Sequence, residues 1–175
     1  MYVHSAILPG RKEAVNICSC TLLDNKTSSC NYAIELATQT GMRVGELAAL
    51  RWCDLQDGYI HIDYSEHRVD YEDHSELVIG EPKNLKHRKF PFNPLIEDIF
   101  HRIKNLGIES EFVFARENGE RYTAHDISCA CNRRGEEAGI EHVCIHRIRR
   151  TVASELRKIY DIKTVASLLG HLEET

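Results

Sequence analysis

The sequence predicts an α+β fold that is mostly helical, with a small three-stranded antiparallel sheet packed on a helical bundle. Apolar residues recur at helical spacing between residues 31 and 50 and again after residue 93. Between residues 58 and 92 the pattern changes to the alternation that is typical of strands. The chain has 175 residues, 42% of them apolar, which is enough for one domain with its own core.

The first predicted helices lie on either side of Gly41. Apolar residues at positions 32, 34, 36 and 37 predict a helix that ends near this glycine. A second helix follows, with apolar positions 44, 47, 48 and 50 on one side. Arg43 lies in its first turn and Glu46 one turn later, so the two side chains can pair at the surface. Residues 1–30 form a partly irregular lead segment.

The predicted sheet consists of strands at residues 59–63, 77–79 and 89–92. An acidic stretch over residues 63–76 separates the first two, and we interpret it as a solvated turn region with strand in or around it. Residues 81–88 form a basic hairpin between the last two strands. Such a hairpin binds an anion or simply protects a sheet edge with charge.

Four further helices are expected in the second half of the chain. The first opens at Asn93-Pro94 and is closed by Gly107, because Pro suits the first helical turn and Gly suits a helix end. The second spans residues 123–138 and ends at Gly139. The third covers the segment after His146, and the last spans residues 163–169 and stops at Gly170.

Composition excludes several classes of protein. The net charge of −5, from 22 basic and 27 acidic residues, argues against a general polyanion binder, so any nucleic-acid surface must be a local patch. No run is long and apolar enough to span a membrane, and no secretory signal pattern is present, so we expect a cytoplasmic protein. Seven cysteines are an odd count, which indicates reduced thiols.

A metal site is the weakest hypothesis for the cysteines. Cys18, Cys20 and Cys30 could be ligands, but no second pair at a zinc-binding spacing completes a set of four. Cys129 and Cys131 stand two apart in a predicted helix and therefore point to different faces. We expect no metal and no cofactor.

The strongest local signal is His146-x-x-Arg149 at the start of a predicted helix. Residues three apart share one face of a helix, and the backbone N–H groups of a helix N-terminus favour an anion. A titratable imidazole, a permanently charged guanidinium and a helix N-terminus together indicate a phosphate site. A basic helix start exposed to solvent would produce the same local pattern.

Five separated motifs together resemble the catalytic domain of the tyrosine recombinases, also called phage integrases. The resemblance covers residues 31–175. Its motifs are Thr40-Gly41-Met42-Arg43-Val44-Gly45-Glu46-Leu47 with Leu50-Arg51-Trp52, Pro82-Lys83 through Arg88 to Pro91, Ala138-Gly139-Ile140, His146-Arg147-Ile148-Arg149, and Leu168-Leu169-Gly170-His171.

The resemblance implies a role for each matching residue. Arg43 and Arg149 match the two catalytic arginines, and Glu46 matches the acidic residue that supports the first of them. The catalytic lysine, the histidine before the second arginine and the histidine after Leu-Gly match Lys83, His146 and His171. The DNA-binding surface implied around the scissile phosphate consists of Lys83, Lys86, Arg88, Lys89, Arg147 and Arg150.

The chemistry implied is site-specific DNA recombination or integration of a mobile element through a 3′-phosphotyrosyl intermediate. Two guanidinium groups hold the phosphoryl oxygens of double-stranded DNA, so a metal ion is not needed. Lys83 supplies the proton to the leaving 5′ oxygen, and His146 accepts one from the attacking hydroxyl. Self-association on DNA, as a tetramer in the full-length protein, is also implied.

The chain departs from the family pattern at its end. The family places its nucleophilic tyrosine a few helical turns after Leu-Gly-His, whereas this sequence stops at Thr175. We therefore expect residues 31–175 to be a catalytic domain without its tyrosine segment, unable to cleave DNA alone. Residues 1–30 are too short for the family's second DNA-binding domain. The alternative is a non-enzymatic DNA-binding or regulatory remnant of an integrase.

Overall fold

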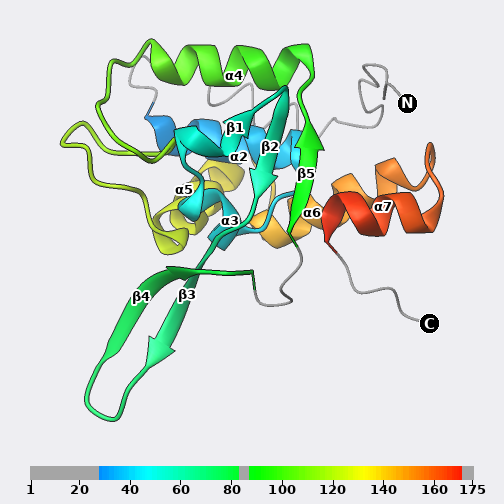
Figure 1. The fold of residues 1–175 in the computed structure, drawn as a ribbon. Coiled ribbons are helices and arrows are strands. Elements are labelled where there is room, and N and C mark those ends of the chain that lie inside the picture. Colours follow the sequence, from blue (N-terminus) through cyan, green and yellow to red (C-terminus); the bar gives the residue numbers. More distant parts are fainter. Residues whose placement is uncertain (1–27, 83–86, 171–175) are drawn as a thin grey trace.

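The computed structural model describes residues 28–82 and 87–170 of the chain, and its elements follow the expected order (Figure 1). The elements are α2 (Ser29–Thr40), α3 (Val44–Ala49), the short 3-10 helix η1 (Trp52–Asp54), β1 (Leu55–Gln56), β2 (Tyr59–Ile62), β3 (Ser65–Asp70), β4 (Ser75–Gly80), β5 (Arg88–Pro91), α4 (Pro94–Lys104), α5 (Ala124–Glu137), α6 (Ile145–Leu156) and α7 (Ile162–Leu169). The predicted α+β, mostly helical class is confirmed.

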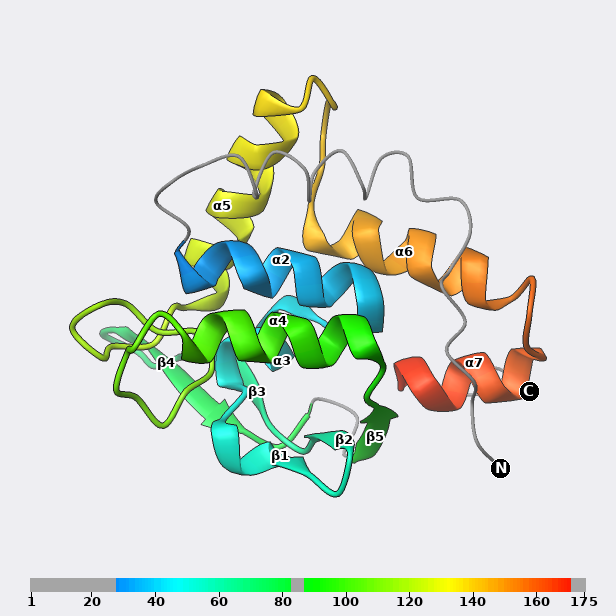
Figure 2. The ribbon, with the colours of Figure 1, turned by 90° about the horizontal axis from the view of Figure 1, so that it is seen from above.

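Helix α2 is the centre of the molecule. Eleven of its twelve residues are buried, and it contacts α4, α5 and α6, so helices surround it (Figure 2). The Ser28 hydroxyl caps its start by accepting a hydrogen bond from the Cys30 N–H. Its end is set by Gly41, whose φ of 64° is left-handed and whose N–H donates to the Ala37 carbonyl.

The outer helices begin where their capping residues predict. The Asn93 side chain caps α4 at the Ile96 N–H, with Pro94 as the first helical residue. Thr123 and Asp126 cap α5 reciprocally. Each of these helices buries an apolar stripe and exposes its polar side, as the sequence pattern predicted.

A three-stranded antiparallel sheet is present, but its strands differ from those predicted. Its order is β1-β2-β5, with Ile60 opposite Leu55 on one side and Phe90 on the other. The predicted strand at residues 77–79 instead belongs to β4, which pairs only with β3 in a separate two-stranded ribbon. The third strand of the sheet is instead the very short β1, which pairs with β2 at the sheet edge, because its apolar Leu55 continues the buried face of β2.

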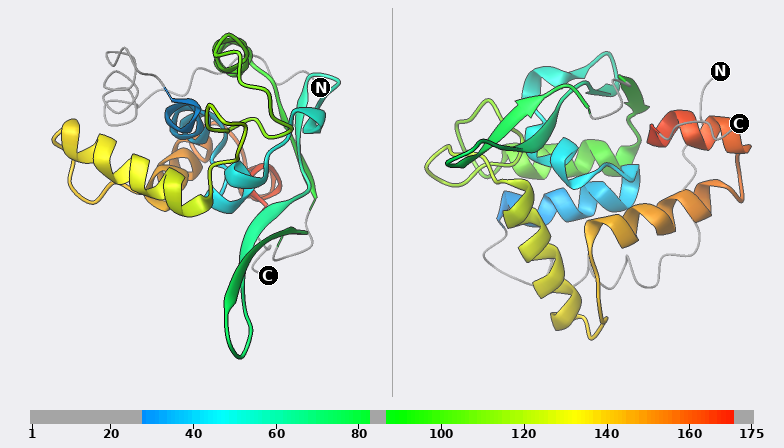
Figure 3. Two further views of the ribbon diagram at one scale, coloured as in Figure 1. Left: turned by 90° about the vertical axis from the view of Figure 1, so that its left-hand side faces the viewer. Right: turned by 90° about the horizontal axis from the view of Figure 1, so that it is seen from below.

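The acidic stretch is therefore mostly strand. Together β3 and β4 form a hairpin that extends away from the helices (Figures 1 and 3). Its base is buried: Glu66, which the sequence placed in a solvated turn, accepts hydrogen bonds from the Arg121 side chain and the Ala124 N–H. The capped start of α5 thus removes this carboxylate from solvent.

No helix in the described part of the chain combines the length and apolar character needed to cross a membrane.

Close packing of α3 on β3 makes Gly45 intolerant of a side chain. A Cβ added there would lie 2.6 Å from the Ser65 Oγ and 2.7 Å from the Glu66 carbonyl oxygen. We expect Gly45→Ala to lower the free energy of unfolding by about 1–3 kcal/mol, measured by denaturant titration, because backbone must shift. Gly80→Ala is the control, since its Cβ would approach no atom closer than 3.9 Å. Equal losses in both variants would contradict this packing.

Candidate active site

The site is built around the Glu46 carboxylate, at the first turn of α3. Arg43, the residue just before α3, donates its backbone N–H to Glu46 Oε2 at 2.7 Å and its Nη1 to Oε1 at 2.9 Å. Both hydrogen bonds run from Arg43 to Glu46, so the carboxylate satisfies the backbone N–H at the N-cap of α3 and also holds the guanidinium beside it. The Arg43 side chain is 40% exposed, so part of the guanidinium faces solvent, whereas Glu46 is fully buried.

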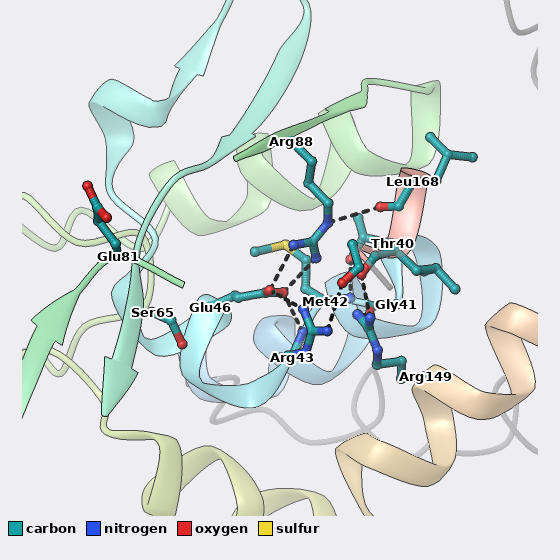
Figure 4. Close-up of polar contacts among 12 residues, drawn as sticks. Thr40, Gly41, Met42, Arg43, Glu46, Ser65, Glu81, Arg88, Arg149 and Leu168 are labelled. Atoms are coloured by element: carbon teal, nitrogen blue, oxygen red, sulfur yellow. Dashed lines mark hydrogen bonds and ion pairs between the residues drawn. The ribbon is translucent and has the colours of Figure 1, made fainter. Parts of the chain in front are cut away.

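Arg88, from β5, closes the other side of the carboxylate (Figure 4). Its Nη1 donates to Glu46 Oε1 at 2.8 Å and its Nη2 to Oε2 at 2.7 Å, a bidentate pair between two buried side chains. Its Nε donates to the Leu168 carbonyl of α7 at 3.0 Å. All three guanidinium nitrogens of Arg88 are therefore engaged within the protein.

Arg149 reaches the same region from α6. It is buried, and its Nη1 donates to the Gly41 carbonyl at 2.5 Å while Nη2 donates to the Leu169 carbonyl. Gly41 must be a glycine here, because its φ is left-handed and a Cβ would lie 2.7 Å from the Leu169 side chain. The two helix ends that sequence reasoning assigned to Gly41 and Gly170 thus meet at Arg149.

Three arginines hold three consecutive carbonyls at the end of α7. Arg88 binds the carbonyl of Leu168, Arg149 that of Leu169, and Arg43 that of Gly170, the last at 3.0 Å. The final carbonyls of a helix have no partner within it and carry partial negative charge. The guanidinium groups satisfy them, so α7 and the arginines fix each other's positions.

The electrostatics favour an anion. Arg43, Arg88 and Arg149 against Glu46 leave a net charge of +2, three positive charges less one negative. Burial raises the pKa of Glu46, but hydrogen bonds and charge from Arg88, then from Arg43, outweigh it and lower the pKa below its ordinary value. Burial, aided by the Arg43 charge, lowers the pKa of Arg149 to about 10, which keeps it cationic at neutral pH.

Donors remain for a ligand on two of the three arginines. A guanidinium has five N–H groups. The side-chain contacts recorded among the described residues use two N–H groups of Arg43 and two of Arg149. The remaining donors can hold the oxygens of a tetrahedral anion such as a phosphate diester.

The predicted site residues are brought together only in part. Arg43, Glu46 and Arg149 come from separate segments and meet at the end of α7. His146 is exposed in the first turn of α6, which also carries Arg149. Lys83, Lys86 and His171 lie outside the described residues.

Arg88 differs from the sequence-based expectation of an exposed side chain that contacts DNA. Its side chain is only 5% exposed and is bound to Glu46, whereas the expected surface residues Lys89, Arg147 and Arg150 are exposed. The strand alternation carried the signal: Arg88 stands two residues before the buried Phe90 and so shares its inward face. The predicted strand began at residue 89, one residue too late, and so left Arg88 in the hairpin.

Comparison with known sequences gives one family. The sequence pattern described as the "Phage integrase family" matches residues 12–174. The chain is 30% identical over 146 residues to the tyrosine recombinase XerC of Corynebacterium glutamicum, covering 79% of this chain and 41% of that protein. It thus spans about two fifths of the length of the curated relatives that it matches.

Solved structures share the fold. The Tn1549 transposon integrase in complex with transposon right end DNA superimposes with a TM-score of 0.77 at 21% identity, over 90% of this chain and 55% of that one. A lambda integrase tetramer bound to a Holliday junction superimposes with a TM-score of 0.70 at 20% identity, over 95% of this chain and 45% of that one.

The buried carboxylate predicts a pH-dependent contribution to stability. Glu46→Gln leaves Arg88 buried without its counter-charge, so we expect a loss of about 3 kcal/mol near pH 7, measured by urea unfolding. Because the folded-state pKa of Glu46 lies below its ordinary 4.5, its contribution is present above that value and is lost as pH falls through the folded pKa. The difference from wild type should therefore shrink in acid. Glu117→Gln, at an exposed position, is the control, and we expect it to leave the free energy of unfolding unchanged both near pH 7 and in acid. A loss independent of pH would contradict the assignment.

Proposed function

Because this chain belongs to the phage integrase family, as its motifs predicted, we propose that it binds the scissile phosphate of double-stranded DNA for site-specific strand exchange. One observation carries the proposal furthest. Arg43, just before α3, and Arg149, in α6, are held on adjacent carbonyls at the end of α7, and each has N–H groups that its contacts with described residues do not use. Two fixed guanidinium groups in a net positive site suit a phosphodiester whose oxygens gain charge during attack.

The proposed chemistry is transesterification at phosphorus. A tyrosine hydroxyl attacks the phosphodiester, forms a 3′-phosphotyrosyl bond and breaks the bond to the 5′ oxygen, which takes up a proton. Arg43 and Arg149 hold the non-bridging oxygens, where negative charge develops. From sequence position we assign His146 as the group that accepts the tyrosine proton and Lys83 as the donor to the leaving oxygen, with His171 a further donor to the phosphate.

The proposed partner is DNA, bound by a local basic surface. Exposed Lys89, Arg147 and Arg150, with Lys83 and Lys86 from sequence, would contact the backbone phosphates around the site. The Tn1549 neighbour is bound to transposon end DNA and the lambda neighbour is a tetramer on a Holliday junction, which supports DNA binding and self-association on DNA as proposals here.

We also propose that residues 1–175 by themselves do not cleave DNA. None of the six described tyrosines is among the recorded contacts of the site arginines. Tyr160 lies just before the eight-residue α7, whose other end forms the site, and at ~1.5 Å per residue the two ends are about 12 Å apart. We therefore place the nucleophile outside the described residues.

Loss of the first arginine should weaken DNA binding without unfolding the protein. Arg43→Ala leaves the buried Glu46–Arg88 pair intact and removes one phosphate contact. We expect about tenfold lower affinity for a DNA duplex, measured by fluorescence anisotropy, and a salt slope smaller by about one. Lys104→Ala, an equal loss of charge on α4, is the control. If both variants lose the same affinity, Arg43 is only part of a diffuse basic surface.

Residues 1–175 should form no covalent adduct with a nicked DNA duplex that traps phosphotyrosyl intermediates. The measurement is a denaturing gel, in which an adduct migrates as a band that resists denaturation. Should such a band appear, the proposal on the nucleophile is wrong, and its loss in Tyr160→Phe would identify the attacking residue.

A further inference from the structure

Arg88 is the site arginine whose guanidinium makes the most hydrogen bonds within the protein. All three of its nitrogens donate within the protein, two to Glu46 and one to the Leu168 carbonyl. The backbone of Gly170 also lies against it, since a Cβ added there would be 3.1 Å from Arg88 Nη1. Arg88 thus makes more contacts within the protein than Arg43 or Arg149, each of which uses two N–H groups, and we assign it no direct phosphate contact.

Stability alone does not account for this buried ion pair. Replacing such a pair with apolar residues of similar volume is often neutral or stabilising, because the desolvation of both charges is costly. What distinguishes this pair is the third partner of the carboxylate. Glu46 Oε1 accepts a hydrogen bond from Arg43 as well as from Arg88. The positive charge of Arg88 therefore determines how much of the positive charge of Arg43 is neutralised by Glu46.

We propose that Arg88 is a positioning residue for phosphate binding, which acts by neutralising Glu46 and by holding the end of α7, so that Arg43 keeps its charge and aim. This inference rests on the proposed function of Arg43 and Arg149. With Arg88 present, the charges of Glu46 and Arg88 cancel, and the two arginines assigned to the phosphate contribute +2. Without it, an ionised Glu46 would neutralise Arg43 and leave Arg149 alone.

The charged groups that face Glu46 in the described part of the chain come from three segments. Within residues 28–82 and 87–170 they are Arg43 beside its own helix, Arg88 from β5 and Arg149 from α6, whereas the end of α7 contributes backbone carbonyls. Glu66 of β3, the strand packed on α3, is separately bound to Arg121 and the Ala124 N–H. Removal of Arg88 deletes the largest of the influences that lower the pKa of Glu46, while burial, which raises it, remains.

The test measures duplex DNA affinity against pH for the full chain carrying Arg88→Met. Above the raised pKa of Glu46 we expect about tenfold weaker binding than wild type, and recovery as the pH falls and Glu46 is protonated. The double variant Glu46→Gln with Arg88→Met has no ionisable carboxylate at this position, so above the raised pKa it should bind more tightly than Arg88→Met and show no pH step. Arg88→Lys, which keeps one positive charge, should have an affinity between those of Arg88→Met and the wild type. Circular dichroism shows whether Arg88→Met is folded. If it is not, the double variant and Arg88→Lys are compared with wild type in its place.

A merely structural role predicts a different result: the same fold-loss in Arg88→Met at every pH and no rescue in the double variant. Either of these, or unchanged binding, overturns the inference. Carboxyl-carbon NMR of free protein separates this from failure of the proposed function. A rise in the pKa of Glu46 in Arg88→Met, or in its place Arg88→Lys, supports the coupling even if the wild type does not bind DNA. An unchanged pKa overturns it.

Discussion

The buried Glu46 carboxylate is the constraint on which the rest of the site depends. Its two oxygens accept four hydrogen bonds, two from Arg43 and two from Arg88, and the residue is fully buried. Three arginines gathered at one helix end would otherwise repel one another. One negative charge at their centre allows them to converge while leaving the site net positive. The carboxylate thus makes a concentrated positive site possible in an acidic protein.

Ordinary helix-end chemistry is used here for a functional purpose. The last carbonyls of α7 need donors, and two of the three arginines that supply them, Arg43 and Arg149, are the ones expected to meet a phosphate. Two left-handed glycines, Gly41 and Gly170, end the helices whose final residues surround Arg149. Stability of the helix ends and geometry of the site are therefore the same set of contacts, and a change in one alters the other.

The distribution of charge reconciles an acidic chain with a proposed DNA site. Between residues 65 and 81, six acidic residues and one arginine account for the whole net charge of −5, so the remainder of the chain is neutral. Most of that segment is the β3–β4 hairpin, which extends away from the helices (Figure 3). The net charge of the chain therefore reflects the acidic hairpin, whereas the electrostatic potential at the site is set by the site's own residues.

The sequence by itself determined the helices, their caps and the family, because periodicity, capping residues and glycines act over a few neighbouring residues. It also singled out Arg43, Glu46 and Arg149. Which strands share a sheet, and that Arg88 is bound inside, were decided by tertiary structure. Strand pairing and burial depend on partners that are distant in sequence, such as the Glu46 that Arg88 binds across 42 positions. Backbone carbonyls of α7 complete the site. Every residue has a backbone carbonyl, so the residue type does not reveal which carbonyls the arginines contact.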